Sequence, residues 1–222
     1  MLLTSIRNWL YLRVYLPIFW SQRGKNSKNS LSLFALFLKL FPSPRPHHLK
    51  MKVLRRFGGS NAWIETGTYV GDGALAISEF AQVLHTIEPS KDLSDIALKR
   101  VKVKNNIYLH VGTSENLLPK ILETLIQDGY KDLSLWLDGH YSGGETFLGN
   151  LETPIISELE TVGRYSTSFP NMSIIIDDLR CFNPKISEYN MYPEIQYLLD
   201  FAKAQKLDLL LTRDMCIMKS AQ

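Results

Sequence analysis

The sequence predicts a doubly wound α/β domain with a mostly parallel sheet, and three observations lead to this prediction. From residue 51 onward, apolar runs of strand length alternate with longer segments of helix length, the pattern of a parallel sheet flanked by helices. A glycine-rich turn follows the first of these runs. The last two runs, 207–211 and 215–219, are separated by only three residues, which permits a hairpin but no helical crossover. The last strand pair should therefore be antiparallel.

The other elements are expected in alternating order along the chain. Each expected strand is short, mainly apolar and bounded by polar or turn-forming residues. The strands before the hairpin are expected at 62–66, 83–87, 107–111, 133–137 and 173–176. The helices are expected near 74–81, 93–101, 115–127, 154–162 and 192–204. This order is that of a Rossmann-like domain closed by one terminal antiparallel strand.

A proline cluster at 42–46 divides the chain, because proline disrupts a helix interior. Residues 1–50 are expected to form an N-terminal helical arm with a Pro-rich linker, and residues 51–222 the Rossmann-like domain. The arm contains two apolar runs, 2–20 and 31–41. We expect them to be two helices that cover the core or the cofactor.

Composition and charge restrict the partners and the compartment. A net charge of +3 over 222 residues is too small for the strong positive field of a nucleic-acid-binding protein. Arginine and proline interrupt the first apolar run and no cleavage site follows it, so neither a membrane-spanning helix nor a secretory signal is expected. Peripheral membrane contact of residues 1–41 through Trp9 and Trp20 is the alternative.

Cys181 and Cys216 lack a CxxC spacing, which favours a cytoplasmic location. The oligomeric state is left open, a homo-oligomer included.

The glycine-rich segment from Glu65 to Gly73 is the strongest candidate for a cofactor loop. It reads E-T-G-T-Y-V-G-D-G, so its glycines differ in spacing from the GxGxxG dinucleotide motif. Glycine is expected where the backbone turns sharply and approaches a ligand closely. The acid at Glu65 favours an amine-bearing ligand, such as the ammonium of methionine, over a pyrophosphate.

Two further positions complete this candidate cofactor site. Glu88 ends the second expected strand, where a carboxylate can bind both hydroxyls of a ribose. Ser114 follows the third strand, where an adenine could lie. Glu88 alone would be interpreted as a solvated strand end, but the combination predicts S-adenosylmethionine as the cofactor. The residues expected to bind it are Glu65, Gly67, Tyr69, Gly71, Gly73, Glu88 and Ser114.

A group of carboxylates is expected beside the cofactor. Asp138 follows the fourth expected strand, and Asp177 and Asp178 follow the fifth, so neighbouring strands should bring them together. Converging carboxylates repel one another unless a cation or protons compensate. Oxygen ligands favour Mg²⁺ or Ca²⁺ over zinc. The sequence therefore predicts a divalent cation, Mg²⁺, held by these three aspartates, which would activate a substrate hydroxyl. The alternative for the Asp177–Asp178 pair is a helix cap.

His140 and Asp138 are the predicted catalytic residues. His140 lies two residues after Asp138 in a glycine-containing loop, where an imidazole could act as general base. A structural role for this histidine is the alternative. Arg180 could hold a carboxylate or phosphate of the substrate, or could pair with Asp178. Both possibilities are left open.

Segments 65–73, 137–144, 153–154 and 175–178 together resemble a known family. They are similar to bacterial class I S-adenosylmethionine-dependent methyltransferase-like proteins, often encoded among polysaccharide genes, and the lead-in with Lys50 fits as well. More distantly, the last segments are similar to the macrocin-type sugar O-methyltransferases.

The macrocin-type resemblance implies that Asp138, Asp177 and Asp178 hold Mg²⁺ and the hydroxyls of an acceptor sugar. The chain departs from that type at two positions: His140 stands where the type has Asp, and Leu179 replaces a Tyr. The favoured hypothesis is an O-methyltransferase of polysaccharide biosynthesis that acts on a sugar-like small molecule. The alternatives are a non-catalytic scaffold that binds a partner or membrane through its first 41 residues, and an NAD-dependent enzyme, which the glycine spacing disfavours.

Overall fold

The computed structural model describes residues 18–20, 47–59, 61–139, 153–183, 191–212 and 214–221. The prediction for His140 falls outside the described residues, as does most of the prediction for the N-terminal arm.

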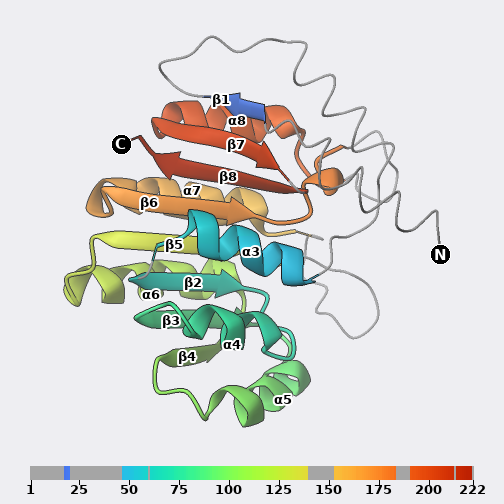
Figure 1. The fold of residues 1–222 in the computed structure, drawn as a ribbon, viewed down its shortest axis with the longest axis vertical. Coiled ribbons are helices and arrows are strands. Elements are labelled where there is room, and N and C mark those ends of the chain that lie inside the picture. The colour runs from blue at the N-terminus through green and yellow to red at the C-terminus, as the bar shows by residue number, and fades with distance from the viewer. Residues whose placement is uncertain are drawn as a thin grey trace, which may run out of the picture.

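The described residues form one twisted sheet of eight strands, with helices on both faces (Figure 1). The strands are β1 (Ile18–Trp20), β2 (Ala62–Thr66), β3 (Val83–Glu88), β4 (Ile107–Val111), β5 (Asp132–Leu137), β6 (Asn171–Ile176), β7 (Leu207–Thr212) and β8 (Met215–Ser220). Their order in the sheet is β1-β7-β8-β6-β5-β2-β3-β4. Strands β2 to β6 are parallel, whereas β8 is antiparallel to both β6 and β7. The predicted fold class and the predicted antiparallel pair are confirmed.

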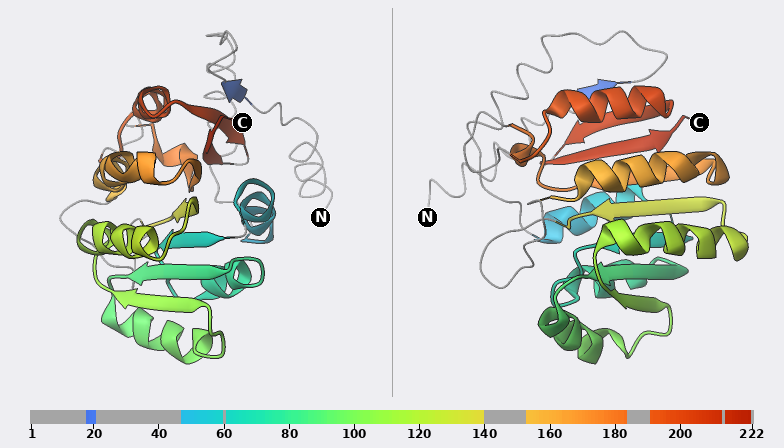
Figure 2. Two further views of the ribbon diagram at one scale, coloured as in Figure 1. Left: turned by 90° about the vertical axis from the view of Figure 1, so that its left-hand side faces the viewer. Right: turned by 180° about the vertical axis from the view of Figure 1, so that it is seen from behind.

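The helices cover the two faces of the sheet (Figure 2). They are α3 (His47–Phe57), α4 (Asp72–Ser78), α5 (Lys91–Val101), α6 (Ser114–Gln127), α7 (Ile155–Tyr165) and α8 (Ile195–Ala204), with short 3-10 turns at Ser166–Ser168 and Leu179–Cys181. One apolar cluster joins the sheet to α3, α4 and α5, and a second joins its other face to α6, α7 and α8. Because both faces are covered, β2 and β3 are buried along their whole length.

The N-terminal region differs from the prediction in two places. Residues 18–20 are a strand, although we expected a helix, and they pair with 209–211 on β7. An edge strand has unpaired peptide groups, and β1 supplies partners for those of β7. The domain boundary that we placed after residue 50 lies inside α3, whose Val53 and Leu54 are buried in the core. Within the described part of the chain, no helix is long and apolar enough to span a membrane.

Candidate functional site

The carboxyl ends of the parallel strands bring the predicted site residues to one edge of the sheet. Backbone hydrogen bonds continue from strand to strand past the last paired residues: Gly67 donates to the carbonyl of Ile87 (3.0 Å), and Asp138 to that of Thr66 (3.2 Å). Asp177 in turn donates to the carbonyl of Leu137 (3.1 Å). Open α/β sheets bind ligands at this edge. The cofactor loop and the aspartates are therefore neighbours.

The predicted cofactor loop between β2 and α4 makes a tight turn. Its backbone is left-handed at Gly67 (φ 84°), Tyr69 (φ 52°) and Gly71 (φ 90°). The Gly71 amide closes the turn by donating to the carbonyl of Thr68 at 2.9 Å. Tyr69 is the unusual member, because a non-glycine residue rarely has positive φ. Its side chain is half exposed, so it lies at the open side of the loop.

Two glycines of this loop are required by contacts within the protein. A Cβ atom at Gly73 would overlap Oε1 of Glu65 and lie 2.5 Å from the ring of Trp136. A Cβ atom at Gly67 would lie 2.7 Å from the carbonyl oxygen of Asp138. We expected glycine here for close approach to a ligand. The structure gives a different reason, since the atoms that exclude a side chain belong to Glu65, Trp136 and Asp138.

Glu65 is fully buried beneath the loop. Its Oε2 accepts a hydrogen bond from Oγ1 of Thr86 at 2.6 Å, and Thr86 is also hydrogen-bonded to Oγ1 of Thr68 at 2.5 Å. Burial raises the pKa of Glu65 to about 8, the hydroxyl of Thr86 opposes this rise, and Glu88 adds to it. A cation bound next to Glu65 would favour its ionised form. The side chain is therefore suited to an amine whose binding drives off its proton.

Glu88 lies on the other side of the same loop. Its Oε2 accepts from the amide of Tyr69 (2.8 Å), and its Oε1 from the amide of Ser90 (2.9 Å). Burial raises its pKa, and the two amides oppose the rise. Each carboxylate oxygen has more than one lone pair, so both can also accept from a vicinal diol. Ser114, at the start of α6, is buried near the end of the neighbouring strand β4.

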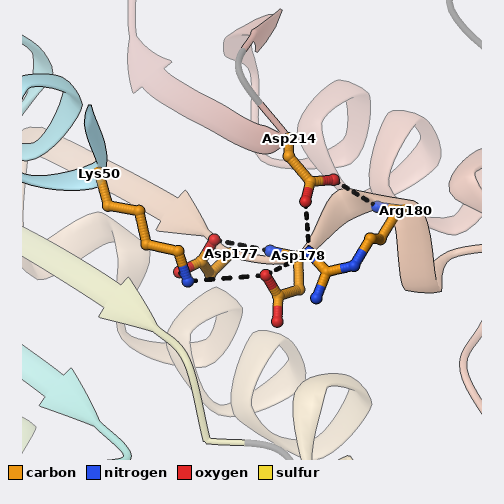
Figure 3. A network of polar contacts seen from close by, with 5 residues as sticks. All are labelled: Lys50, Asp177, Asp178, Arg180 and Asp214. Carbon is orange, nitrogen blue, oxygen red and sulfur yellow. Dashed lines mark hydrogen bonds and ion pairs between the residues drawn. The ribbon is translucent and has the colours of Figure 1, made fainter. Parts of the chain in front are cut away.

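The paired aspartates after β6 meet a lysine (Figure 3). Nζ of Lys50 lies 2.5 Å from Oδ2 of Asp177 and 3.6 Å from Oδ1 of Asp178. Burial lowers the pKa of Lys50, but Asp138, Asp177 and Asp178 together raise it above its ordinary value. Burial and the charge of Asp177 raise the pKa of Asp138 well above its usual range. The cluster thus contains a protonated ammonium at its centre.

Arg180 completes the cluster from the other side. Its Nη1 donates to Oδ1 of Asp178 at 2.6 Å and also to Oδ2 of Asp214. Of the two roles left open for Arg180, the structure has the pairing with Asp178. Four charged side chains of the cluster are at most 13% exposed, namely those of Lys50, Asp178, Arg180 and Asp214. Water therefore screens their ion pairs only weakly.

The predicted Mg²⁺ ligands do not fit a divalent cation as they are arranged. An ion coordinated by Asp177 and Asp178 would have to displace the ammonium of Lys50, which already contacts both carboxylates. Among the residues that the structure describes, no three side chains of His, Cys, Asp or Glu form a group that could hold a metal. The compensating charge that we assigned to Mg²⁺ is supplied by Lys50 and Arg180.

Lys50 and Asp214 were not predicted as site residues. Lys50 follows the proline cluster and was assigned to a linker, although Val53 and Leu54 beyond it are core residues of one helix. Asp214 is in the link between β7 and β8, where aspartate is an ordinary turn residue. A proline just before a helix is a common start signal and could have placed Lys50 in a first turn.

A small hollow opens beside Asp177 and extends toward α7. Its lining is mixed, with Leu137, Ile155 and Ile176 as apolar members, and its free space is about that of one water molecule. The lining residues with polar or aromatic side chains are Asp177, Thr153, Glu158, Phe182 and Tyr192.

Comparisons with known proteins agree with this architecture. No protein-family model and no curated protein sequence matches the chain. Among solved structures, an O-methyltransferase from Bacillus cereus in complex with SAH is similar over 100% of both chains, with a TM-score of 0.54 and 15% identity. The fold is a Rossmann-like methyltransferase fold. The N-methyltransferase NodS from Bradyrhizobium japonicum is also similar, over 79% of this chain and 96% of its own, with a TM-score of 0.50 and 12% identity. At such identities the likeness establishes the fold alone.

Proposed function

We propose that this protein is an S-adenosylmethionine-dependent O-methyltransferase that acts on a hydroxyl of a sugar or sugar-like small molecule. The observation that carries the proposal is the pair of buried carboxylates, Glu65 and Glu88, on the two sides of the loop that follows β2. The charged cluster of Lys50, Asp177 and Arg180 lies at the same edge of the sheet. A methyltransferase fold supports this assignment.

The cofactor would be held by the loop and the two strand ends beside it. Glu65 would bind the amine of its methionine part, Glu88 its ribose hydroxyls, and Ser114 would lie near its adenine. Tyr69 is exposed at the open side of the loop and could cover the bound molecule. When bound, S-adenosylmethionine supplies an electrophilic methyl group on a sulfonium. The protein then has mainly to orient and deprotonate the acceptor.

The reacting hydroxyl of the acceptor would enter the hollow beside Asp177, which has room for about one water-sized group. An alcohol is a poor nucleophile at neutral pH, so a base must take its proton as the bond to the methyl group forms. Asp138 and His140 are the candidate bases. No step of this proposal uses a divalent cation, because the ammonium of Lys50 lies where the predicted ion would bind.

Calorimetry tests the cofactor assignment. The wild-type protein should bind S-adenosylhomocysteine and not NAD. Glu88→Gln should weaken this binding by about 10-fold or more, because a hydrogen bond to a charged group contributes about 1.5–3 kcal/mol. Glu115→Gln, an exposed change on α6, is the matched control and should bind like wild type. Binding of NAD with no affinity for S-adenosylhomocysteine would overturn the proposal.

Turnover separates the enzyme from the non-catalytic scaffold. Labelled S-adenosylmethionine is incubated with the protein and a panel of free hexoses, amino sugars and nucleotide sugars, and methylated product is measured. Transfer to a hydroxyl supports the proposal. Tight cofactor binding with transfer to nitrogen acceptors only would replace O-methylation by N-methylation.

A further inference from the structure

Helix α3 holds Lys50 rigidly over the aspartates. Val53 and Leu54, one turn beyond it, are buried in the core cluster that α3 shares with Trp63 and α4. The amino end of α3 is thereby fixed over the carboxyl end of β6 (Figure 3). The Lys50 side chain is 13% exposed and that of Asp177 is 0% exposed, so the ammonium lies between the buried carboxylate and the outside.

The charges of the cluster show why Lys50 is needed. The guanidinium of Arg180 is already shared between Asp178 and Asp214. Asp177 is fully buried, and a buried charge is costly unless it is paired. Among the described residues, Lys50 is the cation that pairs with Asp177. The ammonium of Lys50 thus supplies the positive charge that the sequence analysis assigned to a metal ion.

We propose that the ammonium of Lys50 is the built-in cation of this site, standing in place of a divalent metal and binding the acceptor oxygen during methyl transfer. The inference rests on the proposed function. An ammonium has three N–H donors; the 2.5 Å contact with Asp177 uses one, whereas Asp178, at 3.6 Å, is an ion-pair partner beyond hydrogen-bonding distance. A remaining N–H donor can be directed at an oxygen in the hollow that Asp177 lines.

The reaction balances without a metal. The oxygen of the acceptor forms a bond to the methyl carbon while the bond from sulfur to that carbon breaks, leaving a neutral thioether. The hydroxyl proton passes to the base, Asp138 or His140. Lys50 keeps all of its protons and stabilises the negative charge that the oxygen acquires as its proton leaves. It is therefore a donor to the reacting atom and not the base.

Metal binding tests the inference without any acceptor. The probe is Mn²⁺ alone, followed by its electron paramagnetic resonance signal, with Mg²⁺ calorimetry in parallel. Wild type and Lys50→Arg should bind neither ion, because the positive charge is retained. Lys50→Met should bind one ion per chain, since the carboxylates then lack their cation, and Asp177→Asn added to it should abolish that binding. Lys52→Met, an exposed change on the same helix, should behave like wild type.

Two results would overturn the inference. The first is a wild-type protein that binds one Mn²⁺ per chain and loses it on Asp177→Asn. The second is a Lys50→Met protein that binds none. If Lys50→Met folds poorly, it is refolded with and without Mn²⁺: recovery that requires the ion supports the inference, and failure to recover counts against it.

Activity supplies an independent measurement once an acceptor has been found by the turnover assay. Wild-type transfer should be unchanged in excess EDTA. Lys50→Met should lower kcat by about 10²–10³-fold, the cost of removing one donor to a developing oxyanion. Its affinity for S-adenosylhomocysteine should stay unchanged. Transfer that stops in EDTA and returns with Mg²⁺ would contradict the inference, whereas absent cofactor binding would contradict the proposed function instead.

Discussion

The carboxylate of Asp214 holds Arg180 at two points. Its Oδ1 accepts the backbone amide of Arg180 at 2.8 Å, and its Oδ2 accepts the guanidinium. The carbonyl of Asp214 also accepts the amide of Leu179 at 2.8 Å. The turn between β7 and β8 therefore positions the segment that carries Asp177 and Asp178. The antiparallel end of the sheet is in this way coupled to the charged cluster.

We expect Asp214→Asn to lower the free energy of unfolding by about 1.5–3 kcal/mol, because Arg180 keeps Asp178 as a partner but loses its charged hydrogen bond to Asp214. Urea unfolding at neutral pH measures this. Asp200→Asn, an exposed change on α8, should alter stability by no more than about 0.5 kcal/mol. Equal stabilities of the two variants would show that Arg180 does not depend on Asp214.

Gly73→Ala should destabilise the fold by about 1–3 kcal/mol, the usual cost of overpacking a core. The added methyl group would overlap the Glu65 carboxylate and the Trp136 ring, which are both buried. Gly59→Ala is the control, since its methyl group would meet only Oγ of Ser134 at an ordinary 3.5 Å. Thermal unfolding of both variants without cofactor decides the matter. A Gly73→Ala protein as stable as wild type would indicate that Glu65 can move aside.

The local pattern of apolar and polar residues in the sequence was sufficient to predict most of the fold. It was not sufficient to predict the charged cluster. The strands β2, β3, β5 and β6 are mainly apolar and almost entirely buried, as expected of parallel strands covered on both faces, whereas β4 at the end of the sheet is partly exposed. The strand β1 has three residues, and its conformation depends on the free edge of β7.

The predicted site was incomplete for a similar reason. Asp138, Asp177 and Asp178 follow strands, so their convergence could be predicted from topology. Lys50 reaches the aspartates from a helix that precedes the first core strand. The spacing of residues in the sequence does not indicate that contact. Without it, the unbalanced negative charge was assigned to a metal ion.

The buried carboxyl group of Glu65 should make stability fall as pH rises. Its pKa is about 8 in the folded protein and near 4.5 when exposed, so between these values the folded state holds a proton that the unfolded state releases. The stabilisation is complete below about pH 4.5 and is lost as pH rises through about 8. Glu65→Gln should remove this part of the pH dependence, and Glu115→Gln should retain it. Urea unfolding across this range, without cofactor, measures both.

The raised pKa of Glu65 also predicts that a proton is released when the cofactor binds. If the cofactor amine lies against Glu65, the carboxyl group must ionise when the complex forms. Calorimetry with S-adenosylhomocysteine near pH 7, in buffers of different ionisation enthalpy, should then show protons released by wild type and fewer by Glu65→Gln. Identical proton release from the two proteins would remove Glu65 from the amine site.

A pair of histidines on β3 and β4 should make stability fall as the pH drops into the acid range, which is opposite in sign to the effect of Glu65. Nδ1 of His85 lies 2.9 Å from Nε2 of His110, and the His85 ring stacks on that of Tyr108 with centroids 5.1 Å apart. Burial and the neighbouring His110 lower the pKa of His85 to about 4, with Asp128 opposing, and burial lowers that of His110. The hydrogen bond needs one neutral ring as acceptor, so the folded state resists protonation of the pair.

The sign of the resulting effect follows from these lowered pKa values. Between about pH 6.5 and about 4 the unfolded histidine binds a proton that folded His85 does not, so stability is complete above about 6.5 and is lost as pH falls. His85→Gln should flatten the acid limb of the stability profile, whereas His48→Gln, an exposed change at the start of α3, should leave it unchanged. The measurement is urea unfolding from neutral to acid pH, with ring proton shifts in magnetic resonance spectra reporting the titration directly. A His85 ring that titrates near its ordinary pKa would show that the pair opens in solution, and the predicted acid loss would then have to come from other groups.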